Sequence, residues 1–394
     1  MVLTERHIVK PNKELISLCS KAKELYNQAL YYWRQSVFGN IEYFNEFELV
    51  NLFREFNEPS FRALPSDSAQ QTIKFLFKNI KSWQQAKKEF LKSPRNFLGK
   101  PRIPKYKNEL SELYFTINQL RYKNNFIHFP KSINLKPIKV KSNNIDFCRI
   151  IPRADHFIIE FTYKVKETKE AIFNKKAIGI DLGLNNLITS VSTEGAAEII
   201  NGRSLKSINQ FYNKKKSKLQ SKLKTKKTSK RIQKISLKRN NKVNDFIHKT
   251  SRFIIQNALK KDISLIVIGN NKTWKQEINL GTKTNQNFVS IPHTQLIEKI
   301  KYKAKMVGIQ VQTVEESYTS KCSALDLEEI KKHEVYLGKR VKRGLFKASG
   351  DIYINADANG ALNILRKVIG DEFLKENFNS IVSCVLQPVK INIF

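Results

Sequence analysis

Hydrophobic residues in the N-terminal part of the chain recur every three to four positions. One series runs through Leu15, Leu18, Ala22, Leu25, Ala29 and Trp33, and another through Ile73, Phe77, Ile80 and Trp83. This spacing puts the apolar side chains on one face of a helix. We therefore expect residues 11–108 to form a helical domain. It ends in an extended basic segment, 99–107, because Pro101 and Pro104 exclude a helix there.

Between residues 109 and 170 the pattern changes to short runs in which apolar and polar residues alternate. Examples are 126–129, 138–141 and 157–163, which polar turns separate. Such alternation places the apolar side chains on one face of a strand. We expect a small β-barrel module here. Residues 1–10, with Ile8 and Val9, would supply its first strand, so that the helical domain is inserted in the module.

From residue 171 onward strands alternate with helices, which is typical of an α/β domain. The expected elements are a buried strand at 177–180, its hairpin partner at 187–191, a third strand at 265–268, a helix at 291–307 and a fourth strand at 309–314. We assign 171–320 to this domain, 321–350 to a basic insertion, 351–370 to the domain's last segment and 371–394 to a C-terminal tail. The predicted fold class is multidomain α+β.

The charge of the chain is strongly positive. Lys and Arg number 71 against 35 Asp and Glu, a formal net charge of +36. A compact chain with this charge repels itself unless a polyanion neutralises it. A nucleic acid fits, because its phosphates exchange bound counterions for Lys and Arg. A membrane surface is the alternative, but no apolar run approaches the ~20 residues that span a bilayer.

One segment carries much of this charge. Residues 206–239 contain 14 Lys or Arg and no acid, with apolar seams at Leu219, Leu223, Ile232 and Ile235. This pattern predicts a basic helical hairpin at 204–240. The alternative is a charged surface that contacts only solvent. A segment with so many positive charges and no negative ones would repel itself, so we favour contact with nucleic acid.

The four cysteines are scattered along the chain, at Cys19, Cys148, Cys322 and Cys384, and form no CxxC pair. No secretory apolar segment follows Met1. Both observations are typical of a protein of the reducing cytoplasm.

Acidic residues at the ends of predicted elements are the candidates for chemistry. Asp181 ends a buried strand in Gly-Ile-Asp-Leu-Gly at 179–183, Asp357 opens a helix, and Glu315 and Glu316 follow the fourth strand. Carboxylates from several strand and helix ends can hold two Mg²⁺ ions for phosphodiester cleavage. The alternative is that both aspartates have a structural role alone, Asp181 as a turn cap and Asp357 as the cap of its helix.

The run at 179–183 also fits the phosphate-binding hairpin of actin-fold and sugar-kinase ATPases. Two arguments weigh against that interpretation. The part of the chain from residue 175 onward is too short for two such lobes, and it contains no second Asp-Gly-Gly phosphate loop. An actin-fold ATPase therefore stays a remote alternative.

Taken together, these motifs resemble the TnpB (OrfB) family of transposon-encoded RNA-guided nucleases, compact relatives of the type V CRISPR effectors. The resemblance runs through 179–183, Asn-Asp-Phe-Ile-His-Lys at 244–249, Tyr-Thr-Ser-Lys at 318–321 and 355–364, and includes the basic segment 99–107. Before residue 175 it rests on the order of elements. It implies an RNase H-like RuvC nuclease domain in which Asp181 and Asp357 match the first and last catalytic aspartates.

The resemblance also implies partners and cofactors. A guide RNA would pair with target double-stranded DNA, and the protein would hold the heteroduplex in a basic channel and read a short flanking motif. Two Mg²⁺ ions would serve the cleavage reaction. A protein of a bacterial insertion sequence would act in the cytoplasm at the nucleoid, with no membrane partner.

The sequence departs from the family pattern at the second acid. The family usually ends the third strand as Ile-Glu-Asp-Leu, but here the expected glutamate is Gly269. Either the acid has moved to the adjacent strand end, at Glu316 or Glu315, or the protein is a nuclease-dead RNA-guided binder that acts as a repressor. We favour relocation, because both aspartates remain. We prefer Glu316 to Glu315, since neighbouring side chains of a strand point to opposite faces.

The second departure concerns zinc. The family usually carries two CxxC pairs before the last aspartate, which together form a four-cysteine structural site. Only Cys322 remains in this chain. One thiolate cannot form a tetrahedral site, so we predict no zinc. We expect residues 321–350 to be held instead by the hydrophobic residues Tyr336, Leu345 and Phe346.

The candidates for contact with nucleic acid are basic or aromatic residues in three segments. They are Lys100, Arg102, Lys105 and Lys107; Lys214, Lys215, Lys216, Lys226, Lys227, Arg231, Arg239 and Lys249; and Trp274, Lys275 and Gln276 with the segment 285–288. Aromatic rings can stack on bases. For Trp274 and Phe288 the alternative is that they close the core beside the cleft.

Overall fold

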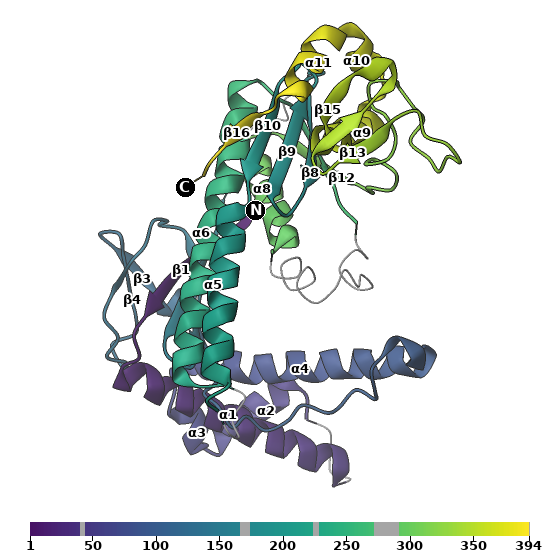
Figure 1. The fold of residues 1–394 in the computed structure, drawn as a ribbon. Coiled ribbons are helices and arrows are strands. Elements are labelled where there is room, and N and C mark those ends of the chain that lie inside the picture. Colours follow the sequence, from purple (N-terminus) through teal and green to yellow (C-terminus); the bar gives the residue numbers. More distant parts are fainter. Residues whose placement is uncertain (40–43, 166–173, 224–227, 272–290, 394) are drawn as a thin grey trace. The chain divides into compact units, whose positions relative to one another are not determined.

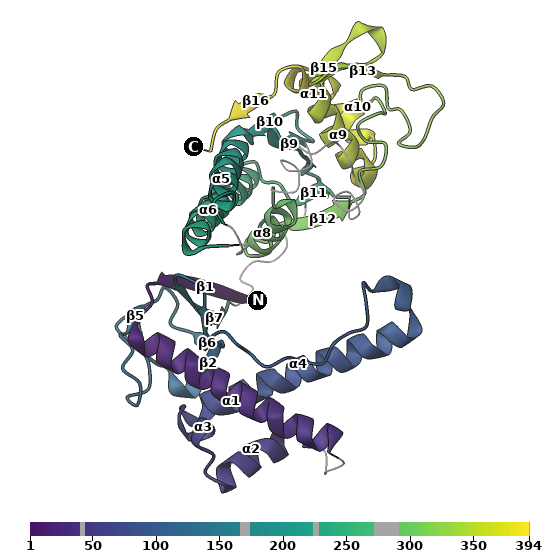
Figure 2. The same ribbon diagram turned by 60° about the horizontal axis from the view of Figure 1, so that its bottom comes forward.

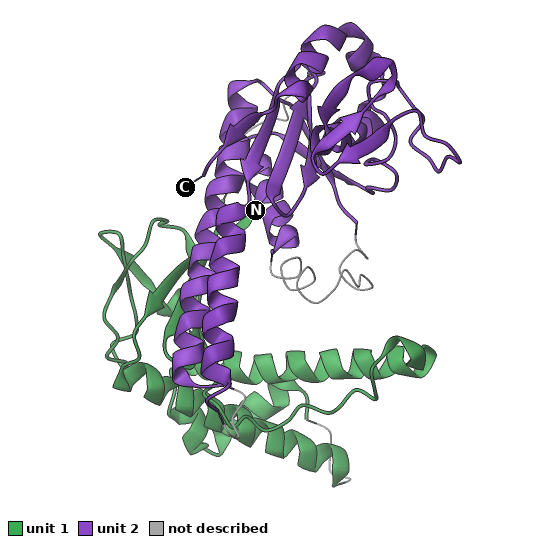
Figure 3. Ribbon diagram, viewed as in Figure 1, with its two compact units in different colours: residues 1–166 green, residues 167–394 purple. Residues whose placement is uncertain are grey.

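The computed structural model describes residues 1–39, 44–165, 174–223, 228–271 and 291–393. The chain forms two compact units, 1–166 and 167–394, each of which is described by itself (Figure 3). No helix in these ranges combines the length and the apolar character needed to cross a membrane.

The described residues of the first unit form four α-helices, which follow its first strand (Figure 1). They are α1 Lys13–Phe38, α2 Glu46–Glu55, α3 Pro59–Arg62 and α4 Ser66–Lys92. Asn12 caps α1 by accepting a hydrogen bond from the Leu15 backbone, and Asn45 forms a capping box with Glu48 at α2. The apolar faces predicted from the sequence are buried, as Leu25, Trp33 and Ile73 show.

Two separate sheets complete the first unit. The larger has the order β1-β7-β6-β2 and is antiparallel, with β1 Val2–Val9, β2 Leu113–Thr116, β6 Ile145–Pro152 and β7 Phe157–Lys164. The smaller contains β3 Arg121–Lys123, β4 Phe126–His128 and β5 Ile138–Lys139. Because β1 pairs with β7, the four helices are inserted between strands of one sheet.

The expected β-barrel is not closed. In the described part of the unit, β1 and β2 lie at opposite edges of the larger sheet and do not pair. The strands that could have joined these edges, β3 to β5, pair with one another instead. The module is therefore an open sheet. Its core is continuous with that of the helices, since Phe115 and Phe161 belong to the same buried cluster as Leu25.

The second unit is built on a six-stranded mixed sheet in the order β12-β11-β8-β9-β10-β16. These strands are β8 Ala177–Leu182, β9 Asn186–Ser192, β10 Ala197–Asn201, β11 Leu265–Gly269, β12 Gln310–Val314 and β16 Val389–Ile391. β8 pairs antiparallel with β9 and parallel with β11. β16 pairs parallel with β10.

Helices cover both faces of this sheet (Figure 2). α6 Lys230–Lys260 and α8 His293–Lys305 share a core with Ile178 and Ile180, whereas α9 Ala356–Ile369 and α11 Phe378–Leu386 share one with Ala177. The other elements are α5 Arg203–Gln220, α10 Glu372–Glu376, β13 Lys339–Lys342, β14 Leu345–Lys347 and β15 Tyr353–Asn355. Because successive side chains of a strand alternate, Asp181 shares the α9 face with Ala177.

Two boundaries differ from those expected. The second helix of the basic hairpin does not end near residue 240 but continues as α6 to Lys260, because Phe246, Ile247 and Ile254 extend its apolar face into the core. The segment 371–394 is not a tail. It contains α10, α11 and β16, and the parallel pairing of β16 with β10 adds a sixth strand to the sheet.

Candidate active site and nucleic-acid interface

Asp181 lies near the carboxyl end of β8, the strand between β9 and β11. Helix α9 packs closely against this strand, which glycine permits at residue 179. A Cβ atom on Gly179 would lie 2.3 Å from the Ala361 carbonyl oxygen and 2.8 Å from Leu365 Cβ. A side chain there would push the helix away. Gly179 therefore lets the amino end of α9 approach Asp181.

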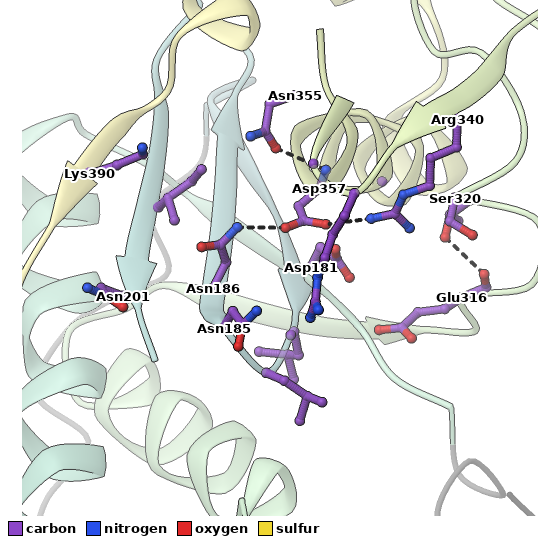
Figure 4. Close-up of a pocket in the computed structure, with 18 of the residues that line it drawn as sticks. Asp181, Asn185, Asn186, Asn201, Glu316, Ser320, Arg340, Asn355, Asp357 and Lys390 are labelled. Carbon is purple, nitrogen blue, oxygen red and sulfur yellow. Dashed lines mark hydrogen bonds and ion pairs between the residues drawn. The ribbon is translucent and has the colours of Figure 1, made fainter. Parts of the chain in front are cut away.

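Asp357 lies in the first turn of α9 and is not its cap. Asn355 caps the helix, because its side-chain oxygen accepts hydrogen bonds from the backbone of Asp357 and Ala358 at 3.0 and 3.1 Å. The Asp357 carboxylate accepts a hydrogen bond from Asn186 Nδ2 at 2.7 Å. It also lies 3.6 Å from the Arg340 guanidinium. The carboxylate is thus held from two sides, toward the same cleft as Asp181 (Figure 4).

Glu316 and Glu315 differ in their surroundings. Glu316 is partly buried and lines the cleft, whereas Glu315 is exposed and accepts a hydrogen bond from the Ser317 hydroxyl at 2.6 Å. A Cβ atom on Gly269 would lie 2.6 Å from Glu316 Oε1 and 2.7 Å from its Cγ. The side chain of Glu316 therefore fills the space into which a side chain at residue 269 would project.

The three acids influence one another electrostatically. Burial, followed by the negative charges of Glu316 and Asp357, raises the pKa of the Asp181 carboxyl from 3.8 to about 8, although part of the side chain remains open to the cleft. Burial raises the pKa of the Glu316 carboxyl from 4.5 to about 7, against the opposing effect of Lys367. Without a cation, the cleft therefore disfavours charge on Asp181 and Glu316.

These carboxylates are the residues that could hold a metal ion. In the ranges that the structure describes, no three acidic, histidine or cysteine side chains are close enough to enclose one as they stand. Their chemistry nevertheless fits Mg²⁺, because hard carboxylate oxygens are its preferred protein ligands and a divalent cation would relieve their mutual repulsion.

The cleft around the acids has a volume of about 860 Å³. Its lining includes polar and basic residues that the sequence analysis did not single out: Asn185, Asn186, Asn201, Arg203, Asn271, Arg340, Arg343, Lys390 and Asn392. The pair Asn185 and Asn186, next to Gly183, could have been suspected as part of the turn after Asp181. No sequence signal pointed to Arg340, which reaches Asp357 from β13 in the basic insertion.

The segment around Cys322 is held by hydrogen bonds from α9. Asn363 Nδ2 donates to the carbonyl oxygens of Thr319 and Cys322 at 2.9 and 2.7 Å, and Asn359 exchanges hydrogen bonds with Cys322 and Ala324. The Cys322 sulfur lies 3.5 Å from the Glu329 carbonyl oxygen and 3.6 Å from that of Lys331, so its single hydrogen can be donated to either carbonyl. Of the three hydrophobic residues expected to hold the insertion, Phe346 is buried, whereas Leu345 and Tyr336 are only partly so.

The basic segment 99–107 splits into exposed and inward-facing residues. Lys100, Arg102 and Lys105 are exposed. Lys107 instead donates a hydrogen bond to the Ser111 hydroxyl at 2.7 Å, and its Nζ lies 4.1 Å from the centre of the Tyr26 ring. Burial lowers the pKa of Lys107 from 10.5 to about 8. Lys107 faces the interior of its unit and does not belong to an exposed basic surface, because its ammonium group lies over the Tyr26 and Phe75 rings.

The basic hairpin consists of α5 and the first part of α6. Lys214, Lys215 and Arg231 are exposed, and Lys215 lies 4.5 Å over the exposed ring of Phe211. Other basic candidates make contacts within the unit. Lys216 lies 6.0 Å from the Tyr212 ring centre, Arg239 donates to Asn209 at 2.7 Å, and Lys249 pairs with Asp245 at 2.9 Å. Lys226, Lys227, Trp274, Lys275, Gln276 and the segment 285–288 lie outside the described residues.

Two family profiles match the second half of the chain. The profile described as "OrfB_IS605: Probable transposase" matches residues 160–275. The profile described as "Cas12f1-like, TNB domain" matches residues 293–364. The two matches together include Asp181, Glu316 and Asp357.

Two curated relatives carry the same family name. The chain is 30% identical over 197 residues to the TnpB-like protein MJ0751 of Methanocaldococcus jannaschii, a match that covers 46% of the chain and 66% of that relative. It is 26% identical over 207 residues to the TnpB-like protein ORF457 of Acidianus two-tailed virus, covering 50% of the chain and 42% of the relative. The chain thus spans less than two thirds of each relative's length.

Solved structures resemble this one in fold. The Cas12f1 chain in a complex with sgRNA and target DNA aligns with a TM-score of 0.52 and 16% identity, over 88% of this chain and 81% of that one. The mini-RNA-guided endonuclease CRISPR-Cas_phi3 aligns with a TM-score of 0.51 and 10% identity, over 94% and 92%. At these identities the likeness concerns the fold alone.

Proposed function

Because the chain belongs to the TnpB family, we propose that it is an RNA-guided DNA endonuclease of a bacterial insertion sequence, active at the nucleoid. One observation carries the proposal of cleavage: Asp181, Glu316 and Asp357 line one cleft, and the Glu316 side chain fills the space beside Gly269 where the family's second acid would project. We therefore assign these three acids to a RuvC-type site.

The partners follow from charge and from the family. A guide RNA would supply sequence recognition, and the protein would hold the RNA-DNA heteroduplex by its backbone and read a short flanking motif in double-stranded DNA. The net charge of +36 supports polyanionic partners. The exposed basic residues of α5, α6 and the segment 99–105 are the surfaces that we assign to them.

In the cleft, Asp181, Glu316 and Asp357 would hold two Mg²⁺ ions. When bound, these ions would activate a water molecule and stabilise the leaving 3′ oxygen of the phosphodiester. The chain's other residues prepare the ligands. Asn186 and Arg340 fix the orientation of the Asp357 carboxylate. Asp181 and Glu316 must lose their protons before they can act as ligands, because both pKa values are raised.

A nuclease-dead RNA-guided binder that acts as a repressor is the second candidate. One observation favours it: in the described ranges the acids do not converge closely enough to enclose an ion as they stand. Both candidates use the same basic surfaces and differ only at the cleft. The actin-fold ATPase has no support. That fold needs two lobes, whereas the described part of the second unit is built on one six-stranded sheet. The family profile that matches is also that of a probable transposase.

The deciding experiment is Mg²⁺-dependent cleavage by the protein co-purified with its RNA. The substrate is matching double-stranded DNA flanked by a randomised motif, and the variants are Asp181→Ala, Glu316→Ala and Glu315→Ala. We expect cleavage by the wild type and by Glu315→Ala, and none by the other two. Tight guide-dependent binding without cleavage in any protein would overturn the nuclease and establish the repressor.

A further inference from the structure

The strand β16 and the residue that follows it present two polar side chains to the cleft. Lys390 lies in β16, Asn392 comes directly after the strand, and both line the cleft. Ile391 and Ile393 pack against the core that contains α6 and α8. Since neighbouring side chains of a strand point to opposite faces, core packing of Ile391 directs Lys390 to the other face of the sheet.

These side chains lie on the same edge of the sheet as the catalytic acids. β8 ends just after Asp181, β10 ends at Asn201 and β16 ends beside Asn392, while β9 begins at Asn186. In the order β8-β9-β10-β16, three strand spacings of ~4.8 Å separate β8 from β16, so the distance between these two strands is roughly 14 Å. Residues from all four strands or their ends line this one cleft, and Figure 4 shows Asp181, Asn186, Asn201 and Lys390 among them.

The cleft carries charges of both signs. Its lining includes the acids Asp181, Glu316 and Asp357 and the cations Arg203, Arg340, Arg343 and Lys390. Arg340 lies 3.6 Å from Asp357, whereas Arg203 follows β10 and Lys390 lies in β16. The cleft lining contains no further Asp or Glu. In the described part of the chain, neither the Arg203 nor the Lys390 side chain forms an ion pair or a hydrogen bond within the protein. Two uncompensated cations in one cleft favour an anionic ligand.

Two asparagines between these cations have fixed orientations. Asn201 Oδ1 accepts a hydrogen bond from the Arg203 backbone at 3.0 Å, and Asn201 Nδ2 donates to Asn392 Oδ1 at 3.0 Å. A side-chain amide nitrogen carries two hydrogens. One hydrogen of Asn201 and both of Asn392 therefore stay available as donors to a ligand, since no partner for Asn392 Nδ2 occurs within the described ranges.

From this arrangement we propose that Arg203, Lys390, Asn201 and Asn392 form a subsite for single-stranded DNA, which binds a phosphate and the adjoining nucleotide next to the bond to be cut. The inference rests on the proposed function and deepens it. A volume of about 860 Å³ is that of a small-ligand pocket. It suits a few nucleotides of one strand. Because phosphate contacts fix register, the subsite decides which phosphodiester lies at the acids.

The first test needs no cleavage. The full-length protein with its RNA is mixed, in EDTA and at physiological salt, with a short thymidine oligonucleotide that contains one photoreactive 4-thiothymidine. Mass spectrometry then locates the cross-linked residues. We expect cross-links at β16 and at residues 201–203. Lys390→Gln and Asn392→Ala should reduce them, whereas the control Lys375→Gln should not, because Lys375 lies on α10 and does not line the cleft.

The salt dependence of oligonucleotide binding gives a second readout. Loss of one phosphate contact lowers the slope of log affinity against log salt by about 0.7 for a single strand. We expect this reduction for Lys390→Gln and not for Lys375→Gln. Equal slopes for the two variants, with equal cross-linking, would overturn the subsite. Competition by an oligoribonucleotide but not by DNA would overturn the assignment to DNA and identify RNA as the ligand.

The third arm separates this inference from the nuclease proposal. On matched DNA, Lys390→Gln should cut at dispersed positions, whereas Lys375→Gln should cut at the same position as the wild type. Loss of folding alone would reduce the rate of cleavage without changing the position of the cut. If the wild type does not cleave but still cross-links at β16, the nuclease fails and the subsite stands. If it cleaves at one position in all variants and β16 does not cross-link, the subsite fails alone.

Discussion

The Oε1 atom of Glu316 lies 2.6 Å from the position that a Cβ atom on Gly269 would occupy. Gly269 ends β11 and is paired with Val314, the last residue of the neighbouring parallel strand β12, and Glu316 follows two residues later. A side chain at residue 269 would therefore require the Glu316 side chain to shift, and also the Ile364 side chain, whose Cδ1 atom lies 2.5 Å from the same position.

Because the two positions share this space, we expect that a glutamate at residue 269 can replace the one at residue 316. Glu316→Gly should lower the cleavage rate by more than about 100-fold, since even outer-shell partners of metal ligands contribute 10- to 100-fold. Adding Gly269→Glu should restore part of the rate, because the carboxylate then enters the same space from β11. Single-turnover cleavage measures both. The control Glu315→Gln should cut normally, and a double variant no faster than Glu316→Gly would contradict the exchange.

Stability without metal should depend on pH. Folding raises the pKa of Asp181 to about 8 and that of Glu316 to about 7, so between about pH 4 and 8 the folded protein binds more protons than the unfolded chain. Its stability in EDTA should therefore fall as the pH rises through this interval and level off above about 8. Thermal unfolding from pH 5 to 9 measures this.

The matched control for this pH dependence is Asp181→Asn, which cannot titrate. Its melting temperature in EDTA should fall less steeply with pH than that of the wild type. Mg²⁺ should raise the wild-type melting temperature more at pH 8 than at pH 6, because the ion competes with protons for the carboxylates. Identical pH profiles for the two proteins would refute the assignment of these raised pKa values.

Asn186 should matter for cleavage and not for DNA binding. Its Nδ2 group donates to Asp357 at 2.7 Å and orients a proposed metal ligand. We expect Asn186→Ala to reduce the cleavage rate by about 10- to 100-fold while guide-dependent affinity for DNA is unchanged. Raised Mg²⁺ should partly rescue the variant. A loss of DNA affinity as large as the loss of rate would show that Asn186 acts on the substrate instead.

The segment around Cys322 should depend on Asn363 and not on a bound metal. Asn363→Leu removes three side-chain hydrogen bonds: those to the Thr319 and Cys322 carbonyls and the one accepted from Arg366. The Cys322 carbonyl keeps Asn359 as a donor, whereas the Thr319 carbonyl loses its side-chain donor. The change should cost about 1–3 kcal/mol in the free energy of unfolding. Urea denaturation measures this loss, with Asn377→Ala as a control that removes one partly exposed hydrogen bond. Unfolding of the wild type by a zinc chelator would contradict the prediction.

Lys105 and Lys107 should differ in their contribution to nucleic-acid binding. Lys105 is exposed, whereas Lys107 donates to Ser111 and contacts Tyr26 and Phe75. Lys105→Met should reduce the salt slope of nucleic-acid binding by about 0.7–0.9, the share of one phosphate contact. Lys107→Met should leave the slope unchanged, because its charge faces the protein interior. A larger effect at Lys107 would place it on the binding surface.

The sequence determined the features that depend on local pattern. Helical periodicity located α1 and α4, and the succession of strands and helices expected after residue 171 located β8, β9, β11 and β12 to within a few residues. The motifs around Asp181 and Asp357 singled out two residues that the structure places at one cleft. The excess of positive charge identified the basic hairpin. Each of these signals lies within one segment, where spacing and composition act directly.

Only the tertiary structure decided which residues from distant segments meet. The segment after β12 brought Glu316 rather than Glu315 to the cleft, and parallel pairing with β10 turned an expected tail into a sixth strand that carries Lys390. Packing against rings turned Lys107 inward, and separate pairing of β3 to β5 left the expected barrel open. These outcomes depend on long-range contacts, which no local periodicity encodes, because the direction of a side chain is set by the partner that its element finds.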